Sequence, residues 1–181
     1  MAEKLMKAAF KEGGKRGVEL EGASDLSGIL FYNVSVETPE GDPALLEKVM
    51  EGMNLEVDEA EEERRGGSGK IGKLIVSSGE QQLGLMCYVP TEKLDQLNPR
   101  DWMSSIELIK NTEKYSAEIV KEDANTCIAV IKADQEKGIY PIKLRDDAIS
   151  SSITFLQTKG LFPEIKDDDD DDEFVYGDDD L

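Results

Sequence analysis

The chain has 181 residues, 39% of them hydrophobic, and a formal net charge of −19 at pH 7. A chain of this length buries one core, so we expect one domain and a tail. The acidic charge disfavours binding to nucleic acid through clustered Lys and Arg, so we expect no direct contact with DNA or RNA. The absence of histidine excludes Ser-His and Cys-His nucleophilic catalysis and histidine-ligated zinc.

The charged N-terminus and the two cysteines predict the compartment. The first ten residues favour an amphipathic helix and carry too many charges for the apolar part of a signal peptide. No apolar run approaches the roughly 18 residues of a membrane span. Cys87 and Cys127 each lie in an apolar predicted strand, which favours reduced core residues over a disulfide. We therefore expect a cytoplasmic or nuclear protein that is not associated with a membrane.

Three elements are predicted in the first third of the chain. An apolar stripe predicts a helix over residues 3–11, which Gly13 and Gly14 should end. An apolar run at 29–36 predicts a strand. A loop ending in an Asp-Pro pair follows, and this pair should begin a helix over 42–53.

A strand-turn-strand-helix unit is predicted twice in the remainder of the body. Each unit contains two apolar runs around a polar turn, followed by apolar residues at helical spacing. The predicted elements are strands at 72–77 and 83–89 with a helix over 98–110, then strands at 126–131 and 139–144 with a helix over 146–160. Between the units, Ile119 and Val120 favour a further short strand. The pattern predicts an α/β (α+β) domain over residues 1–163, with a mixed or antiparallel sheet covered by helices.

Residues 54–69 are acidic and then glycine-rich, and they predict a mobile connector. The segment 67–73 after it has the spacing of a phosphate-binding loop, G-x-x-x-x-G-K. Leu74 stands where a magnesium-binding Ser or Thr is needed, and a strand rather than a helix is predicted next, so we expect no nucleotide hydrolysis. The favoured interpretation is a flexible entry into a strand with solvated lysines. Anion binding is a weaker alternative, with candidate residues Gly69, Lys70 and Lys73.

The order of the elements resembles a known family. A strand at 29–36, a helix over 42–53, two strands around a turn and then Pro-Thr-Glu-Lys at 90–93 before a helix resemble the C-terminal DHH-associated domain of alanyl-tRNA synthetases. The resemblance covers about residues 29–110 and implies a link to translation. Where that family has a glycine-rich signature, residues 136–142 read Glu-Lys-Gly-Ile-Tyr-Pro-Ile, so no RNA contact is carried over.

The most distinctive part of the sequence is its C-terminal tail, residues 164–181, which we expect to be disordered. Residues 167–181 contain nine Asp, one Glu and no Lys or Arg, so they contribute −10 of the net charge and leave −9 for the rest. Apolar residues interrupt this acidic run. An acidic segment with an aromatic anchor is typical of a short motif that docks on a basic, partly apolar groove. The candidate partner-binding residues are Asp171, Asp172, Glu173, Phe174, Val175, Tyr176 and Asp178.

The tail also resembles the acidic segment of the beta and delta subunits of eukaryotic elongation factor one. This resemblance again implies translation. We therefore expect a non-catalytic interaction protein, an accessory of the translation machinery, that uses its tail to bind a protein with a basic surface. Three alternatives stay open: a small-molecule or enzymatic site within the domain, an acidic chaperone or nucleic-acid mimic, and a tail that only increases solubility. No cofactor or metal is predicted.

Overall fold

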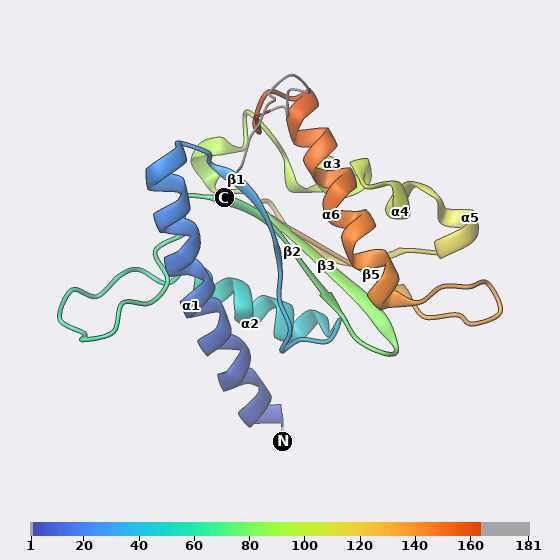
Figure 1. Ribbon diagram of the computed structural model, residues 1–181, viewed down its shortest axis with the longest axis horizontal. Coiled ribbons are helices and arrows are strands. Elements are labelled where there is room, and N and C mark those ends of the chain that lie inside the picture. The colour runs from blue at the N-terminus through green and yellow to red at the C-terminus, as the bar shows by residue number, and fades with distance from the viewer. Residues whose placement is uncertain (1, 164–181) are drawn as a thin grey trace, which may run out of the picture.

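A mixed five-stranded sheet forms the centre of the fold (Figure 1). The computed structural model describes residues 2–163. In that part of the chain, the strands are β1 (Phe31–Ser35), β2 (Gly72–Ser78), β3 (Gln82–Tyr88), β4 (Glu118–Glu122) and β5 (Thr126–Lys132). Their spatial order is β1-β2-β3-β5-β4. β1 and β2 are parallel, and the other neighbours are antiparallel.

Helices cover both faces of this sheet (Figure 1). They are α1 (Ala2–Ser27), α2 (Pro43–Met53), α3 (Pro99–Ser105), α4 (Glu107–Lys110), α5 (Thr112–Tyr115) and α6 (Pro141–Thr158), with a 3-10 turn η1 (Thr91–Lys93). α1 and α2 pack on one face, and α3, α4 and α6 pack on the other. The predicted α/β class, with a mixed sheet covered by helices, is confirmed. Within residues 2–163, no helix is long and apolar enough to cross a membrane.

The apolar run of β2 is explained by cover on both faces. Leu74 and Val76 belong to the core under α3 and α6, while Ile75 belongs to the core under α1 and α2. Successive residues of a strand point to opposite faces, so a strand with helices on both sides needs apolar residues at nearly every position. Lys73 and Ser77 are exceptions, because both are polar and both are fully buried in this strand.

The predicted end of the first helix at Gly13 and Gly14 is wrong, because α1 continues to Ser27. The glycines lie at the crossing of α1 and α2. A Cβ at Gly13 would lie 2.0 Å from the carbonyl oxygen of Val49, and a Cβ at Gly52 would lie 2.2 Å from that of Phe10. Glycine here permits close approach of two helix backbones.

The second strand-turn-strand-helix unit is also corrected. Residues 139–144 do not form the predicted return strand, since a single bridge between Asp134 and Ile139 is followed directly by α6. Pro141 occupies the first turn of α6, where its fixed φ and missing N–H favour a helix start over a sheet position. The antiparallel neighbour of β5 on this side is β4, which contains the short strand predicted around Ile119.

The predicted helix over 98–110 begins as expected and then divides. The side chain of Asn98 accepts a hydrogen bond from the backbone N–H of Asp101, and Pro99 begins α3. Ile106 is extended, with ψ of 127°, and separates α3 from α4. The side chain of Ser151 on α6 accepts a hydrogen bond from the N–H of Glu107. This hydrogen bond links the start of α4, where the helix is interrupted, to α6.

Candidate functional site

The predicted partner-binding residues of the tail, Asp171, Asp172, Glu173, Phe174, Val175, Tyr176 and Asp178, lie outside the described residues. The described chain ends at Pro163, just after α6. Three other features of the body bear on function: the predicted anion site around Lys73, the pockets of the domain, and a basic surface on α1.

The prediction that Lys73 is solvated is wrong, because its side chain is fully buried. Its ammonium group donates hydrogen bonds to Asn54 Oδ1 at 2.6 Å, to the Ser68 carbonyl at 2.6 Å and to the Ile71 carbonyl at 3.0 Å. Burial lowers the pKa of Lys73 well below its ordinary value. All three ammonium N–H groups therefore have protein acceptors, and this side chain serves the fold rather than an external anion.

Tyr88 completes the surroundings of this lysine. β2 and β3 place the two residues opposite each other, with the Lys73 Nζ 4.7 Å from the centre of the Tyr88 ring. The Tyr88 hydroxyl donates a hydrogen bond of 2.7 Å to the Gly69 carbonyl. Burial and the nearby Glu92 raise the pKa of Tyr88. Lys73 and Tyr88 thus fasten the end of the connector onto the sheet.

The glycine-rich half of the predicted mobile connector is packed against the helices. Ser68 is fully buried and donates to the Met53 carbonyl through both its N–H and its hydroxyl. The N–H of Gly66 donates to the carbonyl of Gly14 on α1. Residues 58–63 are exposed and project from the domain as a loop (Figure 1), and the predicted mobility remains a prediction for them.

Gly69 and Lys70 line a pocket of about 630 Å³ between the connector and the end of α1. The same pocket is lined by the carboxylates of Glu21, Asp25 and Glu56. Three carboxylates around one ammonium group favour a cationic ligand over an anionic one. The geometry therefore adds no support to anion binding at Gly69 and Lys70, which stays an untested prediction.

A second pocket of about 620 Å³ lies between α4, α5 and α6. Hydroxyl side chains line it, with Ser150, Ser151 and Thr154 among them. A serine acts as a nucleophile when a base activates it, and this chain contains no histidine. Ser151 already accepts a hydrogen bond from the backbone N–H of Glu107 on α4.

The two cysteines lie side by side in the core as a cross-strand pair of β3 and β5. Both are free and buried. Burial raises the pKa of Cys87 well above its ordinary value and that of Cys127 to about 11, so neither is a reactive thiolate at neutral pH. Within residues 2–163, no group of three or more Cys, Asp or Glu is placed to hold a metal ion.

A basic surface runs along the outer face of α1, and the sequence analysis did not identify it. The exposed lysines Lys4, Lys7, Lys11 and Lys15 recur at helical spacing. At about 100° per residue they lie within about 80° of one another around the helix, so they form one stripe. That spacing was the available signal, because the helix predicted over residues 3–11 already contains three of these four lysines.

Beside this stripe, α1, α2 and the connector enclose a groove of about 580 Å³, the α1 groove. Its apolar and basic lining residues are Met6, Phe10, Lys7, Lys11, Lys48 and Arg65. Three glutamates, Glu3, Glu51 and Glu63, complete it. The α1 groove therefore combines a slight excess of positive charge with exposed apolar surface, in a chain whose net charge is strongly negative.

No protein-family model matches the chain, and a comparison with curated proteins finds no match either. The resemblance to the DHH-associated domain therefore remains an expectation that rests on the order of the elements.

Proposed function

We propose that the protein is a non-catalytic interaction protein whose tail docks on a basic, partly apolar groove of a partner protein. The observation that carries this proposal is the composition of residues 167–181. Ten carboxylates and no positive charge surround Phe174, Val175 and Tyr176. The carboxylates would direct the approach to a basic surface, and the two aromatic rings would provide the buried contact.

The interior of the domain supports a non-catalytic role over an enzymatic one. The buried groups with the most reactive chemistry are Lys73, Cys87 and Cys127. Lys73 has three oxygen acceptors, and the two thiols have raised pKa values. A catalytic nucleophile needs a lowered thiol pKa or an unoccupied amine that faces a cleft. Each of these groups instead supports the packing of the sheet.

The partner is proposed to belong to the translation machinery. The support is the resemblance of residues 29–110 to the DHH-associated domain and of the tail to the acidic segments of elongation factor subunits. A binding partner of this class would present clustered Lys or Arg beside an apolar depression, because both features of the tail need a counterpart.

Affinity capture from cytoplasmic extract, followed by mass spectrometry, tests this function. The intact chain is compared with a chain that ends at Lys166. We expect a protein with a basic surface to bind the intact chain alone and to be released by a synthetic peptide of residues 164–181. If both chains capture the same proteins and the peptide releases none of them, the proposed function is wrong.

A further inference from the structure

The α1 groove has the chemistry that the tail needs in a partner. Lys7 and Lys11 make no ion pair with any residue in the described part of the chain, whereas Lys48 is paired with Glu51 at 3.2 Å and Arg65 with Glu61 at 2.9 Å. Two exposed ammonium groups thus remain available at the groove, with Lys4 and Lys15 continuing the stripe on either side. A polyanionic segment would be attracted to this stripe.

The same groove also has apolar side chains in its lining. Met6 is 36% exposed, and Phe10 is partly buried beside it. Both line the groove with Lys7 and Lys11. A basic stripe next to an aromatic and a thioether side chain suits a segment that carries carboxylates and aromatic rings together.

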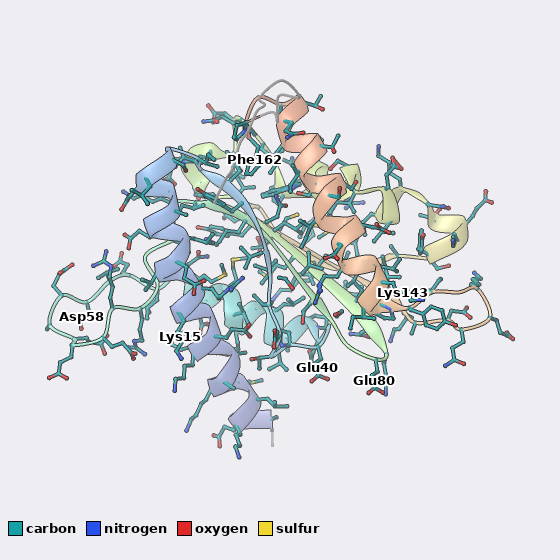
Figure 2. The ribbon with its side chains drawn as sticks, viewed as in Figure 1. Lys15, Glu40, Asp58, Glu80, Lys143 and Phe162 are labelled. Carbon is teal, nitrogen blue, oxygen red and sulfur yellow. The ribbon has the colours of Figure 1, made fainter. Side chains whose placement is uncertain are left out.

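The tail starts at a place from which it reaches the groove. Pro163 lines a pocket with Ser27 at the C-terminal end of α1. The rings of Tyr32 and Phe162 also lie edge to face with their centres 6.5 Å apart, and Figure 2 shows Phe162 near the segment that joins α1 to β1. The tail therefore leaves the domain at one end of α1, and the groove lies toward the other end of the same helix.

The distances along α1 match the length of the tail. At about 1.5 Å per residue, Lys15 lies about 18 Å and Met6 about 32 Å from Ser27 along the helix. At about 3.3 Å per residue, an extended tail brings Asp167 to about 13 Å and Phe174 to about 36 Å from Pro163. The acidic run would thus lie along the lysines, and the aromatic residues would reach the level of Met6.

We infer that residues 167–176 dock on the α1 groove of their own chain, running antiparallel to α1, with the acidic run on the lysine stripe and Phe174 to Tyr176 in the groove. The docked tail is withheld from other proteins, so a partner binds only by displacing it. The inference rests on the proposed function for the chemistry of the tail, and it adds that the chain inhibits its own motif.

Paramagnetic relaxation in the full-length chain tests this contact. A nitroxide is attached to a cysteine introduced by Gly177→Cys, and the buried Cys87 and Cys127 are not labelled in the folded protein. We expect a loss of amide signal intensity at Met6 to Lys15, relative to the reduced label, and no loss near Lys143 at the start of α6, which Figure 2 shows at the opposite side of the sheet. Added salt should restore part of the lost amide signal intensity, because it screens the attraction between the tail and the lysines.

Two double charge-reversal variants distinguish docking of the tail on the α1 groove from a general attraction of the tail to positive charge on the domain. Lys7→Glu with Lys11→Glu should restore the α1 signals, whereas Lys137→Glu with Lys143→Glu changes the net charge equally and should leave the loss in place. All four lysines are exposed, so the fold should tolerate both pairs. Equal effects of the two pairs, or intact α1 signals in the unmodified background, overturn the inference.

A mixed sample distinguishes the chain's own tail from that of a second copy. Isotope-labelled chain without nitroxide is mixed with nitroxide-labelled chain of natural isotope content. We expect full α1 signals in this sample, and a loss as large as in the single-chain experiment would overturn docking within one chain. Failure of docking leaves capture of the partner by the tail intact, while failure of the proposed function leaves the α1 signals weakened, so the two failures are distinguishable.

Discussion

Gly13 of α1 lies against Val49 of α2 so closely that a Cβ on Gly13 would lie 2.0 Å from the Val49 carbonyl oxygen. The atom that such a Cβ would meet belongs to the Val49 backbone and not to the end of a flexible side chain, so it could not turn aside. The crossing of the two helices sets the position of α1, and α1 carries both the lysine stripe and one wall of the α1 groove. The function proposed for this surface therefore depends on this glycine contact.

Gly13→Ala should destabilise the protein by about 1–3 kcal/mol, because the helices must move apart to admit the methyl group. Gly22 is the matched control, since it lies in the same helix with no atom within 4 Å of a Cβ. Gly22→Ala should stabilise by about 0.5–1 kcal/mol through higher helix propensity. Urea unfolding of both variants measures the two changes, and equal stability of both variants would contradict the packing described for the crossing.

Ser152→Ala should destabilise the protein by about 1–3 kcal/mol, because it removes the partner of the buried Trp102 indole N–H and of the half-buried Asn33 side chain. The indole N–H of Trp102 donates to Ser152 Oγ at 2.7 Å, and the Ser152 hydroxyl donates to Asn33 Oδ1. Ser150→Ala on the same helix is the control, since Ser150 is exposed. Thermal unfolding checks the difference, and the account of this contact fails if both alanine variants melt at the wild-type temperature.

The stability that depends on Lys73 should rise with pH. The pKa of Lys73 is 10.5 in an unfolded chain and is lowered by burial in the folded one. Between the lowered value and 10.5, the unfolded chain binds more protons at this residue than the folded chain, and this difference makes the free energy of unfolding increase with pH. Below that window both states are protonated, and above it both are neutral.

Lys73→Met provides the comparison, because all other titrating groups are shared. The variant should be less stable at neutral pH, since Asn54, Ser68 and Ile71 each lose a hydrogen-bond donor. The advantage of the wild type should then grow as the pH rises from neutral toward 10.5, the pKa of the lysine in the unfolded chain. Denaturant unfolding at each pH gives this difference, and a difference that stays constant or shrinks would show that the pKa of Lys73 is not lowered.

Local signals in the sequence were sufficient for much of the fold. Asn98 with Pro99, and the Asp-Pro pair at the start of α2, identify helix starts because a cap and its helix are adjacent in the chain. The apolar runs of β2 and β3 likewise identify strands. Pro141 carried the correct signal for α6, and the prediction of a strand over 139–144 gave more weight to apolar content than to the proline.

The remaining features depend on contacts between distant parts of the chain. Gly13 is a normal helix terminator unless another helix needs close approach, and α2 begins thirty residues later in the chain. Lys73 follows a segment rich in glycine in the sequence, and its burial depends on acceptors supplied by Asn54 and Ser68. The α1 groove could not be predicted for the same reason, since it forms between α1, α2 and the connector.

The central claim, that the tail is an aromatic-anchored docking motif, is tested most directly by measuring the affinity of tail variants for the captured partner at low and moderate salt. Phe174→Ala with Tyr176→Ala keeps the net charge, and we predict a loss of about 2 kcal/mol or more at both salt concentrations. Replacing the six aspartates at 167–172 with Asn should instead weaken binding mainly at low salt. If the aromatic variant binds as tightly as the intact chain while the Asn variant does not bind, the tail acts through charge alone and the motif is contradicted.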